Sequence, residues 1–321
     1  MILPPRLKVG DRATIVSPSG SIADYRDLAE RSKDALEKCS GLVMQFSEHA
    51  FGKEFYSSGT AEERRADLMN AFIDPDVKAI VLSLGGATAI DVVEVLDYEV
   101  IADNPKIIAG ISDCATILNA ITARTGLVTF HGLELFDFGR HGMPFTADSI
   151  REVWFDGWHG KYGANPDWAD LEGDTTRFQG WREIKPGVAS GVAVGGNSEA
   201  LTQLIDTPYS PPLVGSILAL ETYRLQKRHI HALLTSLRMH GVFDRIAGLV
   251  IGYCLGSDEP GGGNERDIAD IARETTSSYS FPIMQVGEIG HQVQNFLIPI
   301  GAEVRMDSSN LTLELTKPAV L

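Results

Sequence analysis

The chain of 321 residues has little cysteine, few basic residues for its acidic content and no long apolar run. Its three cysteines are far apart and form no Cys-x-x-Cys pair, which argues against a disulfide framework and is typical of a reducing, cytoplasmic setting. A net charge of -15 opposes a phosphate backbone and argues against nucleic acid as a main partner. No apolar stretch approaches the ~18 residues of a membrane span, and the first residues lack a signal-peptide pattern, so no membrane partner is expected.

Other familiar signatures are also missing. The double glycine in LGGATAID lacks the G-x-G-x-x-G spacing of dinucleotide binding, and EPGGGNE at 259–265 is predicted to be only a loop. No His, Cys or carboxylate pair has the spacing of metal ligands, and His229 and His231 point to different sides of a predicted helix. The sequence therefore predicts no cofactor and no metal.

Short apolar runs alternate with longer amphipathic stretches up to about residue 150. This alternation predicts βαβ units and an N-terminal α/β domain at 1–150 with a parallel, flavodoxin-like sheet. Binding sites in such sheets form where strands end. The predicted strand ends lie at 17–20, 85–86, 110–113 and 131–132.

The segment 151–186 is rich in glycine and aspartate and is predicted to be a connecting loop. It contains all four tryptophans, which either stack on a ligand or anchor the loop to the body. These are Trp154, Trp158, Trp168 and Trp181. After it, a second α/β domain at 187–321 is expected to end in a β-rich hairpin or small sheet.

Ser112 stands where a predicted strand, ending at Gly110, gives way to a helix whose apolar residues recur from Cys114 onward with helical spacing. A serine there is either a helix N-cap or a nucleophile whose oxyanion would benefit from the helix N-terminus. The stretch departs from the G-x-S-x-G elbow because Cys114 replaces the last glycine. Both interpretations of Ser112 remain open on these residues alone.

A serine nucleophile needs a histidine base and an orienting carboxylate. His131, at a strand end, and His291, between two glycines and a strand, are equally good candidates for the base. Glu221 ends the apolar run SILALET, where a buried carboxylate requires a partner. That partner is either a catalytic histidine or a salt-bridging Arg224 or Arg228.

Eight stretches, in order, resemble the LD-carboxypeptidase family of serine peptidases, which includes the microcin C immunity peptidases. They run nearly end to end: LKVGDRATIVSPSG, GTAEERRADLMNAFIDPDVKAIVLSLGG, GISDCATIL, TFHG, GVAVGGNSEAL, LALETYR, GLVIG and GHQVQNFLIPIG. The resemblance implies a serine hydrolase without cofactor, a homodimer, and an active site in the cleft between the two domains.

Carried over by position, the resemblance makes Ser112 the nucleophile, Glu221 the carboxylate and His291 the base. The backbone N–H groups of Gly86 and Asp113 would form the oxyanion hole. The remaining positions expected to contact or border the substrate are Gly85, His131, Trp168 and Trp181.

The stretch SLGGAT lacks the arginine and the aromatic that flank the double glycine in muropeptide-cleaving members, and so resembles the immunity branch. We therefore expect a small peptide or peptidyl-nucleotide substrate, cleaved at an amide bond. TYRLQKRHIH, after Glu221, departs from the acidic and aromatic residues usual there in the family. The alternatives are a murein tetrapeptide carboxypeptidase that releases D-Ala, and a non-catalytic small-molecule-binding protein.

Overall fold

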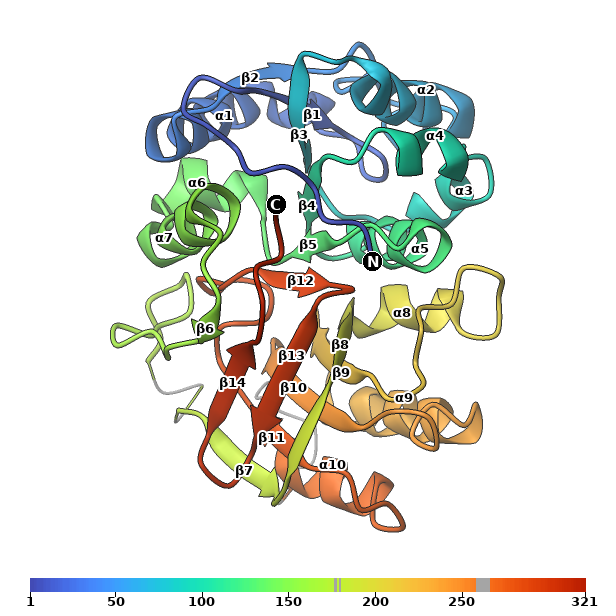
Figure 1. The fold of residues 1–321 in the computed structure, drawn as a ribbon, viewed down its shortest axis with the longest axis vertical. Helices are drawn as coiled ribbons and strands as arrows, with labels where there is room; N and C mark the ends of the chain where they lie inside the picture. Colours follow the sequence, from blue (N-terminus) through green and yellow to red (C-terminus); the bar gives the residue numbers. More distant parts are fainter. Residues whose placement is uncertain (176–177, 179, 258–265) are drawn as a thin grey trace.

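The computed structural model describes residues 1–175, 178, 180–257 and 266–321; the predicted loop at 259–265 lies outside them. Two β-sheets follow one another along the long axis of the molecule (Figure 1). The first has six strands in the order β12-β5-β4-β3-β1-β2. They are β1 (Arg12–Val16), β2 (Val43–Phe46), β3 (Val77–Leu82), β4 (Ile107–Gly110), β5 (Thr129–His131) and β12 (Ile298–Ile300).

Helices cover both faces of this first sheet, as the alternating sequence pattern predicts (Figure 1). They are η1 (Ala23–Tyr25), α1 (Arg26–Ser40), α2 (Ala61–Ile73), α3 (Ala89–Val93), α4 (Tyr98–Asp103), α5 (Cys114–Thr125), α6 (Leu135–His141) and α7 (Pro144–Ile150). Alternate residues of a strand face opposite sides. In β3, Ala79 and Val81 pack into the apolar core that includes α1 and α6, whereas Ile80 and Leu82 pack into the core that includes α2 and α5.

The second sheet has eight strands in the order β6-β14-β13-β8-β9-β10-β11-β7. They are β6 (Gly160–Lys161), β7 (Arg182–Lys185), β8 (Val188–Asn197), β9 (Ile217–Thr222), β10 (Gly248–Cys254), β11 (Ile283–Gln285), β13 (Glu303–Asp307) and β14 (Thr312–Leu315). Strands β8 to β11 are mutually parallel, and the outer strands are antiparallel. The helices of this part are α8 (Ser198–Leu204), α9 (Lys227–Met239) and α10 (Ile268–Thr275).

The segment 151–186 contains more regular structure than the predicted loop. It begins as the π-helical η2 (Arg151–Asp156), which continues α7, and it contributes β6 and β7 to opposite edges of the second sheet. Trp154 is fully buried, with its ring 5.8 Å from that of Phe130. Both strands are short and polar, so their sequences do not predict a strand. They are extended because they pair with the edges of the second sheet.

One strand crosses between the two parts of the chain. β12 belongs by sequence to the C-terminal half, yet it lies beside β5 (Figure 1) and pairs with it antiparallel. In this pairing Ile298 lies opposite His131. The prediction of a β-rich end is therefore confirmed, but its strands do not form one small sheet. β12 joins the first sheet, whereas β13 and β14 join the second.

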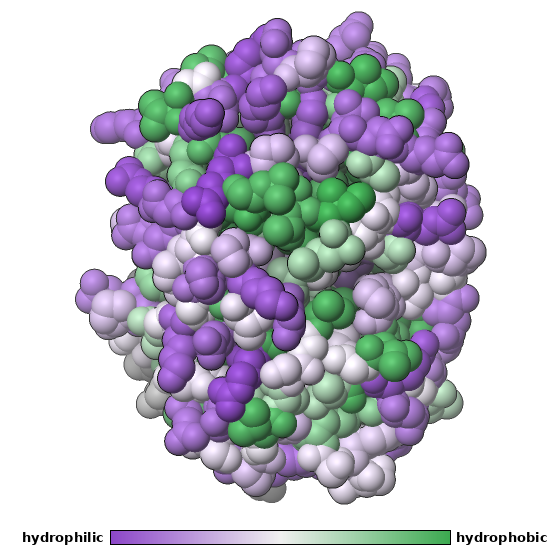
Figure 2. Space-filling view, viewed as in Figure 1, coloured by the Kyte–Doolittle hydropathy of each residue, from purple (hydrophilic) through white to green (hydrophobic). Residues whose placement is uncertain are grey.

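Hydrophilic residues cover most of the face seen in Figure 2, with an apolar patch just above its middle. Within the described part of the chain, no helix combines the length and apolar character required to cross a bilayer.

Candidate active site

Ser112 lies between β4 and α5 with a backbone φ of 63°, in the left-handed region. A non-glycine residue there costs on the order of 1–3 kcal/mol, and such residues cluster at functional sites. The N-cap position of α5 belongs to Asp113, whose side chain makes no capping hydrogen bond to the described residues of this helix. Ser112 is therefore not the N-cap of α5, and its backbone conformation is unfavourable for a serine. Its side chain lies just after the end of β4.

The loop after β3 approaches Ser112 so closely that only glycine fits at residue 85. A Cβ added to Gly85 would lie 2.5 Å from both Cβ and Oγ of Ser112. The Asp113 carboxylate fixes this arrangement, since it accepts hydrogen bonds from Ser19 Oγ at 2.5 Å and from the Ala89 N–H at 2.8 Å. Gly86 packs equally tightly, because its missing Cβ would meet Ser19 Oγ.

Glu221 and His291 form a buried pair. His291 Nδ1 lies 2.7 Å from Glu221 Oε2; Glu221 is fully buried at the end of β9, and His291 is 9% exposed. Asn197, at the end of β8, donates from Nδ2 to the other Glu221 oxygen at 3.0 Å and also caps α8. Ser198 Oγ donates to the Glu221 carbonyl at 2.8 Å.

The ionisation of this pair follows from its geometry. Burial opposes ionisation of Glu221, but the charge of His291 and the hydrogen bond between them outweigh it, so the pKa of Glu221 is lowered. Burial also acts to lower the pKa of His291, and the neighbouring Glu221 carboxylate reverses this, so the pKa of His291 is raised above its usual 6.5. His291 is therefore oriented through Nδ1, and among the described residues its Nε2 has no hydrogen-bond partner.

The pairing of three strands relates His291 to Ser112. Gly110, two residues before Ser112, lies opposite His131 of β5, which lies opposite Ile298 of β12. Because β12 begins seven positions after His291, the strand ladder helps to fix the base relative to the nucleophile.

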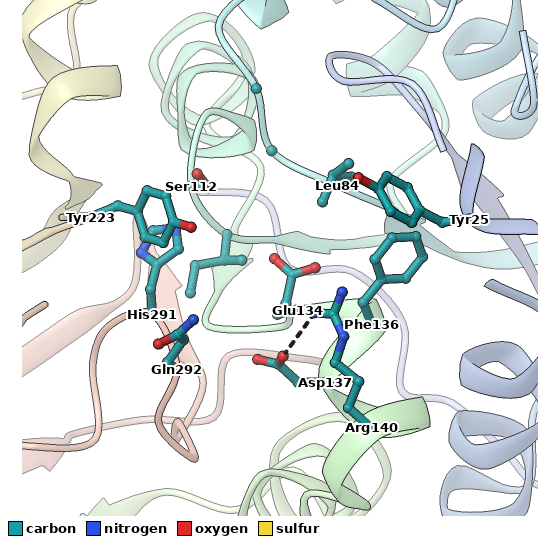
Figure 3. Close-up of a pocket in the computed structure, with 13 residues that line it drawn as sticks. Tyr25, Leu84, Ser112, Glu134, Phe136, Asp137, Arg140, Tyr223, His291 and Gln292 are labelled. Atoms are coloured by element: carbon teal, nitrogen blue, oxygen red, sulfur yellow. Dashed lines mark ion pairs between the residues drawn. The ribbon is translucent and has the colours of Figure 1, made fainter. Parts of the chain in front are cut away.

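Ser112 and His291 line one cavity of about 400 Å³ (Figure 3). Gly85 and Gly86 border it, and the Tyr223 ring lies 4.6 Å from the His291 ring. The other lining residues are Tyr25, Leu84, Ile111, Glu134, Phe136, Asp137, Arg140 and Gln292. The cavity is thus lined from both parts of the chain.

Some predicted positions lie outside this cavity lining. His131 is fully buried, and burial lowers its pKa to about 4, so it is neutral near pH 7. Its ring fills the space left by Gly196, where an added Cβ would lie 2.5 Å from the ring. The expected contact of His131 with substrate stays a prediction.

Trp168 and Trp181 hold the chain just before His291. Trp168 Nε1 donates to the Gly287 carbonyl at 3.0 Å, and Trp181 Nε1 donates to Glu288 Oε2 at 2.6 Å. Neither tryptophan is among the residues that line the cavity. These contacts favour the anchoring interpretation, and stacking on a ligand stays a prediction.

Sequence reasoning missed Asn197, Tyr223 and the charged residues Glu134, Asp137 and Arg140. Asn197 ends GVAVGGN directly before a helix, so the rule that sites form at strand ends would have found it. Glu134 follows the strand end at His131 by three residues, so the same rule would have found it. No sequence pattern could have found Asp137 and Arg140, because their local sequence does not show which face of α6 meets the cavity.

Comparison with known families identifies the class of protein. A model of the LD-carboxypeptidase N-terminal domain matches residues 14–132, and one of the LD-carboxypeptidase C-terminal domain matches residues 190–306. The chain belongs to the LD-carboxypeptidase family, a family of peptidases.

Among curated proteins, the chain is 31% identical to the putative carboxypeptidase YocD of Bacillus subtilis, covering 94% of this chain and 95% of that one. It is 28% identical to a probable murein peptide carboxypeptidase of the same organism (96% and 92% covered) and 26% identical to the microcin self-immunity protein MccF of Escherichia coli (82% and 81% covered).

Solved structures show the same fold. An MccF-like protein from Bacillus anthracis has a TM-score of 0.87 at 30% identity, covering 99% of this chain and 100% of that one. The structure of MccF in complex with glutamyl sulfamoyl guanosine has a TM-score of 0.89 at 24% identity, with both chains fully covered.

Proposed function

We propose that the protein is a serine carboxypeptidase with Ser112 as nucleophile, His291 as base and Glu221 as the carboxylate that orients the base. The observation that carries this proposal is the Glu221–His291 contact of 2.7 Å, beside a cavity that both His291 and Ser112 line. Since Nδ1 is engaged by Glu221, Nε2 is the ring nitrogen available to take a proton.

The reaction is a covalent acyl transfer. His291 Nε2 takes the Ser112 proton as Oγ attacks the scissile carbonyl, and the backbone N–H groups of Asp113 and Gly86 stabilise the oxyanion. His291 then protonates the leaving amine. It next takes a proton from a water molecule, whose oxygen attacks the acyl-serine carbonyl. His291 then returns that proton to Ser112 Oγ as the ester bond breaks and the acid product leaves.

For the substrate, we propose a peptidyl or aminoacyl nucleotide. The SLGGAT stretch and the likeness to MccF, whose complex holds glutamyl sulfamoyl guanosine, support this choice. The alternative is a murein tetrapeptide with a terminal D-Ala, which the 28% identical murein peptide carboxypeptidase supports.

The test is to incubate the protein, and Ser112→Ala beside it, with each substrate and to identify products by mass. We expect cleavage of the aminoacyl sulfamoyl nucleotide at its amide bond and none by the variant. Release of D-Ala from the tetrapeptide alone would move the substrate assignment to murein. If the unaltered chain binds either compound but does not cleave it, the protein is a small-molecule-binding protein and not a peptidase.

We also propose a cytoplasmic homodimer, from the low cysteine content and the family resemblance. Light scattering at micromolar concentration would contradict the dimer by giving the mass of one 34.8 kDa chain.

A further inference from the structure

The wall of the cavity away from His291 is charged. Figure 3 shows the Glu134 carboxyl group in the middle of the cavity, between Ser112 and the ion pair of Asp137 with Arg140. Arg140 Nη1 lies 3.9 Å from Asp137 Oδ1, and the arginine side chain is 46% exposed, whereas that of Asp137 is 9% exposed. The arginine therefore lies at the rim and Asp137 lies inside, whereas Glu134 is half-buried.

One oxygen of the Glu134 carboxyl group lacks the partner that a buried polar atom requires. This atom, Oε1, is buried and has no hydrogen-bond partner among the described residues. Burial, with the nearby Asp137, raises the pKa of Glu134 to about 8 against the opposing effects of His291, Arg140 and the Phe136 N–H. The same cavity contains a second unpartnered group, since Nε2 of the buried His291 also has no partner in the described chain.

The charge balance of the lining selects the kind of group that would satisfy Glu134. Of its acids and bases, His291 is paired with Glu221, and Arg140 is paired with Asp137. Glu134 forms no ion pair with the described lining residues, and when ionised it would be stabilised by a cation that donates hydrogen bonds.

We propose that Glu134, assisted by Asp137, binds a primary ammonium group of the substrate and so makes the enzyme selective for amine-bearing acyl groups. The inference rests on the proposed function, because it places the acyl part of the substrate in the cavity beside Ser112. An apolar wall of Tyr25, Leu84 and Phe136 adjoins the acids (Figure 3) and holds the carbon skeleton that bears the amine.

Two substrate classes carry this chemistry. An aminoacyl nucleotide has a free α-ammonium group next to the scissile carbonyl, whereas a murein tetrapeptide has the ammonium group of its diamino acid side chain. The pocket chemistry is the same for both, so the experiment must separate them.

Binding of an ammonium group should displace the proton of Glu134. In the empty cavity Glu134 is neutral near pH 7, since its pKa is about 8, and it ionises when the cation arrives. Affinity should therefore rise as the pH rises from 6 toward 8. The other titratable groups facing the cavity are Asp137 and Arg140 on α6, His291 before β12, Tyr25 on η1 and Tyr223 after β9.

The test measures binding without turnover, in the Ser112→Ala background, by calorimetry. The ligands are aminoacyl sulfamoyl adenosine, its des-amino analogue, a murein tetrapeptide and the same peptide acetylated on its side-chain amine. Glu134→Gln keeps the size of the side chain and removes its ability to ionise. Glu152→Gln, an exposed position on η2 outside the cavity lining, is the matched control.

We expect Glu134→Gln to weaken binding of the amine-bearing ligand by roughly 10- to 150-fold, the range for a hydrogen bond to a charged group. Its des-amino or acetylated counterpart should bind as before, and proton release on binding should disappear. The ligand pair that shows this selective loss identifies the substrate class. Asp137→Asn should show a smaller loss in the same direction.

Equal losses for amine-bearing and amine-free ligands would overturn the proposal, because Glu134 would then only shape the cavity. No loss for any ligand, or no binding of any amine-bearing ligand, would overturn it as well. The proposed peptidase fails on a separate result, which is turnover that survives Ser112→Ala.

Discussion

The two halves of the site are built by different means. Around Ser112 the geometry depends mainly on backbone, with a left-handed residue next to a glycine that admits no side chain, and the Asp113 carboxylate holds the surrounding loops together. Around His291 it is set by side chains, through hydrogen bonds from Nδ1 to Glu221 and from Asn197 to Glu221. We therefore expect activity to be lost around Ser112 when atoms are added. Around His291 we expect it to be lost when a hydrogen-bond donor or acceptor is removed, even if the side chain keeps its shape.

The largest effect should come from the nucleophile. Ser112→Ala removes one oxygen and keeps the fold, and loss of a triad member costs on the order of 10⁴–10⁶ in rate. Turnover of the cleaved substrate should be lost in Ser112→Ala, whereas the unfolding temperature measured by calorimetry should stay unchanged. Retention of more than about a tenth of activity would remove Ser112 from the mechanism.

Gly85→Ala tests the backbone half by adding a single methyl group. Its Cβ would lie 2.5 Å from Ser112 Oγ, so the hydroxyl or the loop must move. A displacement of about 1 Å costs on the order of 10²-fold in rate. Gly163→Ala is the control, since its added Cβ would meet no atom of the described residues within 4 Å. Equal activity of the two variants would show that the close approach is irrelevant.

Asn197→Ser tests the side-chain half. Serine keeps the N-cap of α8 but loses the amide donor to Glu221. A hydrogen bond to a charged group is worth ~1.5–3 kcal/mol, so kcat should fall by about 10-fold or more. Asp97→Ser, at the cap of α4 far along the chain, controls for cap effects. A change in stability without a change in kcat or in its pH profile would mean that Asn197 is purely structural.

The pH profile reports the paired histidine directly. His291 must be neutral to act as a base, and Glu221 raises its pKa above 6.5. Activity should therefore fall tenfold per pH unit below that pKa, and Glu221→Gln should move the midpoint downward because the stabilising carboxylate is gone. An unchanged midpoint in Glu221→Gln would contradict the pairing.

Trp168→Ala should have the smallest effect on the chemistry and separates the two interpretations of the tryptophans. Stacking on a nucleobase predicts a rise in KM of roughly 5- to 150-fold for a nucleotidyl substrate alone. The Trp168 hydrogen bond to Gly287 favours an anchor, so we expect a lower Tm and similar losses for nucleotidyl and peptide substrates. A selective rise in KM would restore the stacking interpretation.

Sequence could predict what depends on local pattern. The strand ends that place Ser112 and Glu221 follow from apolar runs, and the parallel sheet follows from their alternation with helices. His131 and His291 could not be ranked from residues alone, because burial of the one and the carboxylate partner of the other arise only when distant strands pair. The short strands β6 and β7 escaped for the same reason, since a few residues at a sheet edge are defined by the neighbour they meet. The strand after His291 was predicted, but its pairing with β5 was not.

The antiparallel pairing of β12 with β5 has a consequence for how the protein folds. A fragment ending near residue 150 would leave β5 as an open edge with unpaired N–H and C=O groups, and such edges template aggregation. The N-terminal sheet is completed only when β12 (Ile298–Ile300) has been made. We therefore expect unfolding in one cooperative transition, and expect the halves to associate when co-expressed but to precipitate when made alone.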